Sequence, residues 1–100
     1  MRSVVFNIFL TNSADKSQKN LDKPLRIKIK EAIEKISGNP EDSGEKLVSP
    51  LSDIYSYHLK YKGREVRIAY GINLEEKIIY IYLIAFHENF YKKLKNIMDA

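Results

Sequence analysis

The sequence predicts an α+β fold, in which an N-terminal strand and a two-helix hairpin precede the rest of a mostly antiparallel four-stranded sheet and a C-terminal helix. Three observations support this fold class. Apolar residues alternate with a period of two before residue 10, follow a helical period over residues 25–36, and return to a period of two after residue 54. The expected order of elements is strand, helix, helix, three strands and a last helix.

The N-terminal residues 2–10 are expected to form a strand. Apolar side chains at alternate positions give it a core-facing side: Val4, Phe6, Ile8 and Leu10. Val5 and Phe9 give it a second side that we expect to be partly buried. Thr11, Asn12 and Ser13 then supply a turn and the N-cap of a short polar helix over about residues 14–21.

The second helix gives the clearest signal in the chain. Pro24 fits its first turn, where the missing N–H of proline costs no helical hydrogen bond. Five apolar residues fall on one helical face: Leu25, Ile29, Ala32, Ile33 and Ile36. Gly38, Asn39 and Pro40 are typical of a helix end, and residues 41–50 are predicted to be a polar loop.

The second half of the chain predicts three strands and a helix. Six side chains of a strand pair that begins near Ile54 alternate toward the expected core: Tyr57, Leu59, Tyr61, Val66, Ile68 and Tyr70. Residues 77–86 are apolar on both faces, which predicts a central strand. Residues 87–98 are expected to form the last helix, with Phe90, Leu94 and Ile97 on one side.

Length and composition limit the classes of function. The 100 residues predict a single domain over residues 1–100. The lack of cysteine excludes disulfides, thiol nucleophiles and thiolate metal sites, and it suits a reducing cytoplasm. The longest strongly apolar run, residues 78–86, is too short to span a membrane, and Asn7 and Asn12 argue against a signal peptide. We therefore expect a cytoplasmic protein with no membrane partner.

Positive charge is concentrated on one face of the predicted strand pair. The net charge of +4 permits a nucleic-acid ligand, an acidic protein partner, or simply a solvated lysine-rich surface. Four residues are expected to point away from the core: His58, Lys60, Lys62 and Arg67. Like charges on neighbouring strands repel, which favours a bound anion such as the phosphates of a nucleic acid. The alternative is a solvated face without a ligand.

Two histidines, His58 and His87, suggest proton transfer, because histidine is the side chain best suited to it near neutral pH. Cleavage of RNA needs a base for the 2′-hydroxyl proton, a cation at the phosphate and an acid for the 5′-leaving oxygen. Tyr91, four residues after His87, would share one side of a helix with it and contact RNA, or else pack the helix on the sheet. Each histidine has a structural role as its alternative.

Metal and cofactor chemistry is not expected. The two histidines are far apart in sequence, and the chain has no HExxH, CxxC, P-loop or GxGxxG pattern. We therefore expect neither a metal site nor a cofactor.

Several segments, taken in order, resemble the RelE/ParE-type toxins of type II toxin–antitoxin systems. The segments are residues 21–26, 33–36, 44–47, 51–55, 67–70 and 84–91. The stretch around Arg67 resembles the arginine-bearing strand of that family, and the stretch from His87 to Tyr91 resembles its closing His/Arg-x-x-x-Tyr segment. The chain departs from the family at Asp53 and at Ala85-Phe86, where glycine is usual, and at Val66, where tyrosine is common.

The resemblance implies a toxin that cleaves mRNA as a ribosome-dependent endoribonuclease and so inhibits translation. Its implied partners are mRNA, the ribosomal A site and a cognate acidic antitoxin that wraps the toxin in a hetero-oligomer. Matching positions imply catalytic roles for Lys60, Arg67, His87 and Tyr91 and RNA-binding roles for His58, Lys62 and Arg64. Two alternatives stay open: a ParE-like toxin that poisons DNA gyrase without being a nuclease, and a non-toxic module that binds RNA or an antitoxin.

Overall fold

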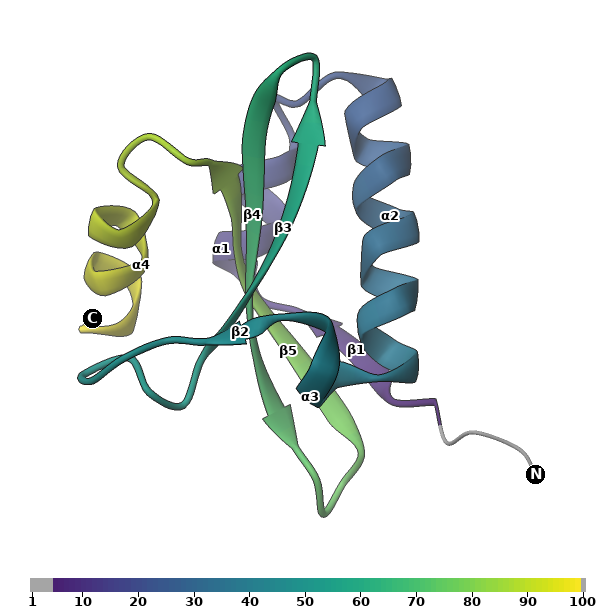
Figure 1. Ribbon diagram of the computed structural model, residues 1–100, viewed down its shortest axis with the longest axis vertical. Coiled ribbons are helices and arrows are strands. Elements are labelled where there is room, and N and C mark those ends of the chain that lie inside the picture. Colours follow the sequence, from purple (N-terminus) through teal and green to yellow (C-terminus); the bar gives the residue numbers. More distant parts are fainter. Residues whose placement is uncertain (1–4, 100) are drawn as a thin grey trace.

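A five-stranded sheet with the order β1-β5-β4-β3-β2 forms the centre of the fold in the computed structural model, which describes residues 5–99 (Figure 1). The elements are β1 (Asn7–Leu10), α1 (Asn12–Gln18), α2 (Lys23–Gly38), α3 (Pro40–Ser43), β2 (Glu45–Lys46), β3 (Tyr55–Tyr61), β4 (Arg64–Asn73), β5 (Ile78–Phe86) and α4 (Phe90–Met98). β1 runs parallel to β5, and the other neighbouring strands are antiparallel. The predicted α+β fold is confirmed.

The strand count is five rather than the predicted four. The extra strand, β2, lies with the short helix α3 in the segment that was predicted to be a loop. β2 has two residues, Glu45 and Lys46, and both are exposed. A strand this short cannot show an alternating pattern, so periodicity alone does not detect it.

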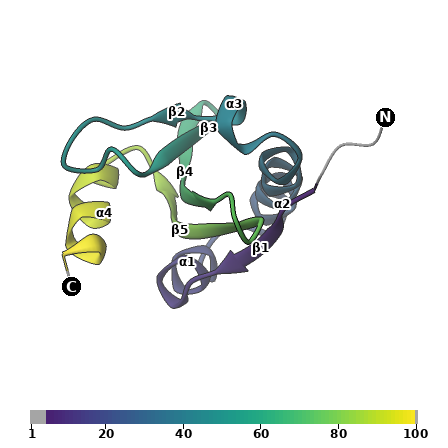
Figure 2. The same cartoon turned by 90° about the horizontal axis from the view of Figure 1, so that it is seen from below.

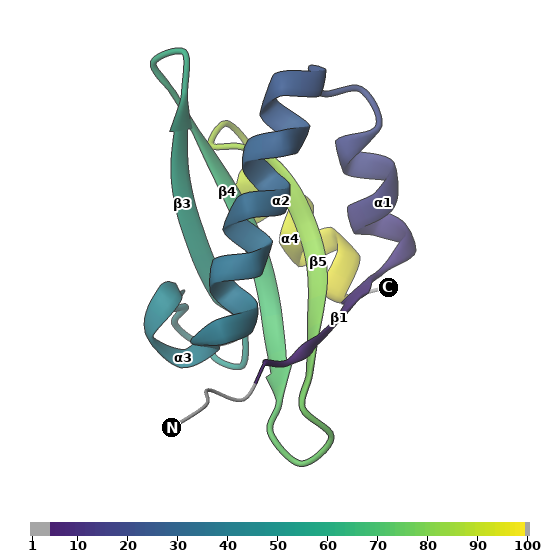
Figure 3. The same ribbon diagram turned by 90° about the vertical axis from the view of Figure 1, so that its right-hand side faces the viewer.

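Helices cover both faces of the sheet. Figure 3 shows α1 and α2 on one face and α4 on the other. Figure 2 shows the loop between β2 and β3 reaching over to α4. None of the helices within residues 5–99 has both the length and the apolar character needed to cross a membrane.

The two N-terminal helices form as local sequence signals predict. The Thr11 hydroxyl accepts a hydrogen bond from the Ala14 N–H at 3.2 Å, which confirms the predicted N-cap. α1 then covers Asn12–Gln18, so it begins and ends slightly earlier than expected. α2 has its proline in the first turn and ends beside Asn39, as predicted.

The first core lies between α2 and the sheet. The stripe predicted on α2 is buried at Leu25, Ile29, Ala32 and Ile36, with Ile33 packed at its margin. It packs against the strand residues Val66, Ile68, Tyr70, Ile79, Ile81 and Ile84. Tyr57, Leu59 and Tyr61 pack against the same cluster and are partly buried. The predicted core-facing side of β3 and β4 is therefore confirmed.

A second core lies on the other face of the sheet, where the predicted apolar side of the last helix packs. Phe90 and Leu94 of α4 are buried against Ala69, Leu83 and Ala85 of the sheet. Leu47, Leu51 and Ile54 extend this cluster from the loop between β2 and β3, and Ile97 packs on it from α4. The face that was expected to be solvated is therefore half covered.

The N-terminal strand is shorter and more exposed than predicted. β1 begins at Asn7, and the predicted residues 2–4 lie outside the described part of the chain. Phe6 and Leu10 pack against the first core, but Ile8 is 36% exposed. Phe9 was expected to be partly buried and is instead 55% exposed, because β1 is an edge strand that α4 does not cover.

The pairing of β4 with β5 contains a bulge. Ala69 pairs with Leu83, whereas the next residue, Tyr70, pairs with Ile81, so Tyr82 is an extra residue in β5. Before the bulge, Ile79 and Ile81 face α2; after it, Ile84 faces α2 and Ala85 faces α4. One extra residue therefore reverses the alternation along the last part of β5.

Candidate functional site

The register of β3, β4 and β5 arranges the predicted site residues in two rows across the sheet. In one row Lys60 lies opposite Glu65, whose carbonyl accepts a hydrogen bond from the backbone N–H of His87 at 2.9 Å. In the next row His58 lies opposite Arg67, which lies opposite Ala85. Neighbouring strands are about 4.8 Å apart, so side chains within a row can interact.

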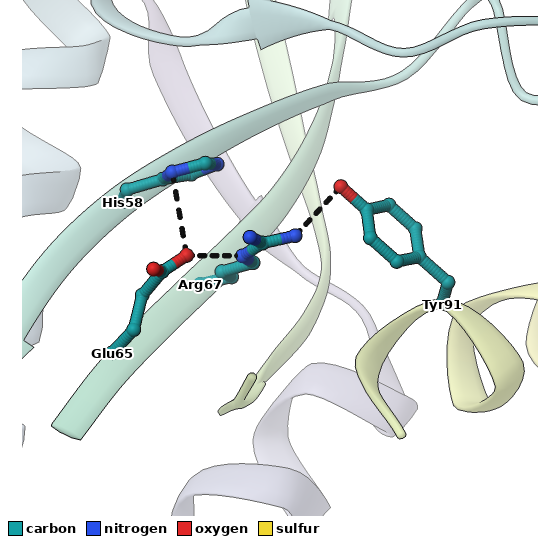
Figure 4. A network of polar contacts seen from close by, with 4 residues as sticks. All are labelled: His58, Glu65, Arg67 and Tyr91. Atoms are coloured by element: carbon teal, nitrogen blue, oxygen red, sulfur yellow. Dashed lines mark hydrogen bonds and ion pairs between the residues drawn. The ribbon is translucent and has the colours of Figure 1, made fainter. Parts of the chain in front are cut away.

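Arg67 is the centre of a polar network that Figure 4 shows from close by. Its Nε donates a hydrogen bond to Glu65 Oε2 at 2.5 Å, and its Nη1 donates to the Tyr91 hydroxyl at 2.6 Å. The guanidinium also lies 5.9 Å from the Phe90 ring centroid and 5.2 Å from that of Tyr91. The Arg67 side chain is 11% exposed, so its position is determined by packing as well as by hydrogen bonds.

Glu65 belongs to this network and was missed among the candidate residues. Its Oε2 lies 3.4 Å from His58 Nδ1 and also accepts from Arg67. Strand alternation contained the signal, because Glu65 is two residues before Arg67 and so shares its face. The sequence argument that repulsion between neighbouring cations favours a bound anion was therefore wrong, because the Glu65 carboxylate lies between His58 and Arg67.

The charges around Glu65 favour its ionised form. The hydrogen bond from Arg67 lowers the pKa of the Glu65 carboxyl below its usual range, more than partial burial raises it, and both His58 and His87 add to the lowering. A carboxylate with a lowered pKa is a weak base, so proton transfer is better assigned to its neighbours.

Tyr91 belongs to the site, but its position relative to His87 differs from the prediction. α4 begins at Phe90, and residues 87–89 form a turn in which Asn89 has a left-handed backbone with φ of 62°. His87 and Tyr91 were expected on one side of a helix, and that expectation was wrong because His87 precedes the helix. Tyr91, on the first turn of α4, instead binds Arg67 through its hydroxyl.

Lys62 and Arg64 lie at the end of the β3–β4 hairpin, away from the Arg67 network. Lys62, with φ of 52°, and Gly63, with φ of 79°, are the two turn residues. The Lys62 ammonium is 5.3 Å from the Tyr61 ring centroid, and the guanidinium of Arg64 lies 3.7 Å from that of Phe86. The prediction that Lys62 shares a face with His58 and Arg67 is therefore wrong, because Lys62 lies in a turn that interrupts the strand alternation.

Arg64 forms its own ion pair. Its Nη2 donates to Glu88 Oε1 at 2.8 Å, and this contact lowers the pKa of the Glu88 carboxyl. Arg64 pairs in register with Tyr61, whose ring belongs to the first core, so both lie on the α2 side of the sheet.

Lys60 lies at the border between the two faces. It lines an open groove between β3 and α2 together with Lys28, Lys35 and Glu31. Further along α2, Arg26 and Lys30 are exposed. Basic side chains of α2 and β3 therefore meet in one groove at the edge of β3. Among residues 5–99, no group of three histidine, aspartate or glutamate side chains is placed to hold a metal ion.

The comparisons with solved structures identify the fold. A chain of the toxin–antitoxin complex RelBE2 from Mycobacterium tuberculosis matches with a TM-score of 0.75 and 20% identity, covering 84% of this chain and 100% of that one. The free E. coli toxin RelE, as a double mutant, matches with a TM-score of 0.72 and 14% identity, covering 92% of each chain. A conserved hypothetical protein from Helicobacter pylori matches with a TM-score of 0.56 and 20% identity, covering 83% of this chain and 96% of that one.

At these identities the solved structures show a shared fold. No curated protein matches the sequence. The family model of the ParE-like toxin of type II bacterial toxin–antitoxin systems matches residues 8–95, which is most of the chain. The chain therefore belongs to the ParE-like toxins of type II bacterial toxin–antitoxin systems.

Proposed function

We propose that this toxin is a metal-independent endoribonuclease that cleaves mRNA in the ribosomal A site and so halts translation. The observation that carries the proposal is the Arg67 network. A largely buried Arg67 side chain is held by Glu65 and Tyr91 on the sheet face where His58 lies opposite it. A fixed cation of this kind can stabilise charge that develops on a phosphate without reorganising during the reaction.

The proposed reaction is attack of the 2′-hydroxyl oxygen on the adjacent phosphorus. The 2′-O–P bond forms while the P–O5′ bond breaks, which leaves a 2′,3′-cyclic phosphate and a 5′-hydroxyl. A base accepts the 2′-hydroxyl proton, and an acid donates a proton to the departing 5′-oxygen. No metal ion, oxidant or second substrate is needed to balance this step.

Each residue has a proposed role in this reaction. Arg67 donates to a phosphate oxygen from Nη2, since Nε and Nη1 bind Glu65 and Tyr91. Lys60 holds the neighbouring backbone as a point charge, and Tyr91 positions the guanidinium. His87, in the turn after β5, is the proposed acid. Lys62 and Arg64, at the hairpin end, are proposed to contact RNA further from the reacting phosphate.

The proposed partner that neutralises the toxin is an acidic antitoxin. Figure 3 shows α2 and α4 on opposite faces of the sheet, and Arg67 packs beside α4. A partner that covers both faces can therefore pass the edge of β3, where Lys60 lines a groove with Lys28 and Lys35. An extended, wrapping segment fits this geometry in a toxin–antitoxin hetero-oligomer. Action on ribosome-bound mRNA would place the toxin in the cytoplasm.

Expression of the toxin without an antitoxin tests the activity. We expect growth to stop, and primer extension on cellular mRNA to show new 5′ ends inside translated frames. Arg67→Ala should relieve toxicity while the protein stays folded and still binds the antitoxin. If confirmed, folded Arg67→Ala and His87→Ala variants were as toxic as the parent, the proposed face would be wrong.

The second candidate function is that of a ParE-like toxin that poisons DNA gyrase without being a nuclease, and the matching family model is one of ParE-like toxins. A gyrase poison would leave mRNA intact and produce double-strand DNA breaks. The same expression experiment therefore separates the two functions, if mRNA ends and DNA breaks are measured in one culture.

A further inference from the structure

His58 differs from the other candidate residues because a carboxylate faces one of its ring nitrogens. Glu65 Oε2 lies 3.4 Å from His58 Nδ1, and Figure 4 shows the imidazole beside this oxygen with its second nitrogen directed away. The contact is long for a hydrogen bond, as is common for catalytic groups before substrate binds. A carboxylate on one nitrogen favours the proton there and leaves the other nitrogen free to accept one.

Glu65 is itself fixed in place. The oxygen that faces His58 also accepts from Arg67 Nε, and Arg67 is packed beside the rings of α4. The orientation of His58 thus depends on the same cation that is proposed to bind the phosphate. Glu65 Oε2 therefore contacts both the His58 imidazole and the guanidinium that is proposed to bind the phosphate.

The strand order supplies an independent argument. In displacement at phosphorus the attacking and leaving oxygens are roughly in line, so the base and the acid must lie on opposite sides of the phosphate. Arg67 is on β4, His58 is on β3 on one side, and His87 follows β5 on the other side. Two strand spacings make about 10 Å between the backbones of β3 and β5, a separation wide enough for a phosphate.

We propose that His58 is the base that accepts the 2′-hydroxyl proton at Nε2, and that Glu65 is the positioning residue that holds the proton on Nδ1. This assignment rests on the proposed endoribonuclease function and changes the role of His58 from RNA binding to catalysis. The proton moves from the 2′-oxygen to His58 Nε2 as the 2′-O–P bond forms. His87 returns a proton to the 5′-oxygen as the P–O5′ bond breaks.

Single-turnover cleavage of mRNA on programmed ribosomes tests the role of His58. His58→Ala should lower the rate by about 10²–10⁴-fold with little change in ribosome binding. Added imidazole should restore part of the lost rate, because it can replace the missing base. Lys60→Ala is the matched control: it should also be slow, and imidazole should not restore it.

A substrate with sulfur in place of the 5′-bridging oxygen separates the base from the acid. A thiolate leaves without protonation, so His87→Ala should regain activity on this substrate while His58→Ala should stay slow. Restoration of His58→Ala by the sulfur substrate would overturn the assignment. So would a rate for His58→Ala equal to that of the parent, or no response to imidazole.

The tautomer of His58 in the free toxin gives a readout that does not depend on cleavage. Nitrogen-15 NMR at mildly alkaline pH should show the Nδ1–H form in the parent and a shift toward the Nε2–H form in Glu65→Leu. Glu88→Gln, which changes the carboxylate paired with Arg64, should leave this signal unchanged. An Nε2–H form in the parent would overturn the role of Glu65.

The failure of the inference can be told apart from the failure of the proposed function. If the parent toxin cleaves no mRNA at all, the endoribonuclease function is wrong and the assignment of His58 falls with it. If the parent cleaves mRNA and His58→Ala cleaves equally fast, only the assignment of His58 is wrong.

Discussion

Replacement of Arg67 by lysine tests whether the fork shape of the guanidinium matters, as distinct from its charge. In the structure Arg67 donates from two nitrogens in different directions, Nε to Glu65 and Nη1 to Tyr91, which leaves Nη2 for phosphate. A lysine ammonium is a single point charge and cannot hold three such partners in those directions. Loss of one transition-state donor costs about 10²–10³ in rate, or roughly 3–4 kcal/mol.

We therefore expect Arg67→Lys to cleave mRNA about 10²–10³ times more slowly than the parent in single-turnover reactions on programmed ribosomes. Circular dichroism should show the same fold, because the aliphatic part of the side chain is kept. Arg26→Lys, on the exposed surface of α2, is the matched control and should cleave at the parent rate. A parental rate for Arg67→Lys would refute the argument from geometry and leave charge alone as the requirement.

Four further outcomes are expected. Tyr91→Phe removes the hydroxyl that accepts from Arg67, so single-turnover cleavage should slow by about five- to tenfold, in line with roughly 1 kcal/mol for one hydrogen bond. Tyr70→Phe removes the buried hydrogen bond from the Tyr70 hydroxyl to the Pro40 carbonyl at 2.7 Å, and thermal unfolding should occur about 4–8 °C lower. Burial raises the pKa of Tyr70, so the folded state holds a proton that the unfolded state loses above about pH 10. The free energy of unfolding should therefore fall as pH rises above about 10, and this part of the fall should be absent in Tyr70→Phe. The association rate with the acidic antitoxin should fall as salt is raised in stopped-flow measurements; a rate that ignores ionic strength would argue against electrostatic attraction around the β3 edge.

Most of the fold was predictable because its elements are long enough to show a period. The α2 stripe and the alternation along β3 and β4 each repeat over several residues, and the buried side chains lie where these patterns place them. β2 and the second core were not predictable in the same way. β2 is too short for a pattern. The sequence showed an apolar second face on β5 and an apolar side on the last helix, but no local pattern showed that these two surfaces pack together.

The facing of the site residues could be predicted inside the paired strands, where side chains alternate, but not in the turns that follow the strands. His58 and Arg67 share a face as expected, because both lie inside paired strands, whereas Lys60 lies at the border of the sheet beside α2. Lys62 lies in the hairpin turn and His87 in the turn before α4, where neither period holds. The Tyr91–Arg67 hydrogen bond joins residues 24 positions apart and depends on where α4 packs, which no local pattern encodes.

The extra residue at Tyr82 has a consequence for comparing this toxin with its relatives. Because the bulge reverses which side chains of β5 face α4, a relative without it would direct the residue aligned with Ala85 toward the opposite side of the sheet. An alignment that places no gap near Tyr82 would then equate side chains from different faces. Family members should therefore first be aligned by which side chains of β5 face α4. Only then should the residues at the end of this strand be compared to assign a toxin to a class.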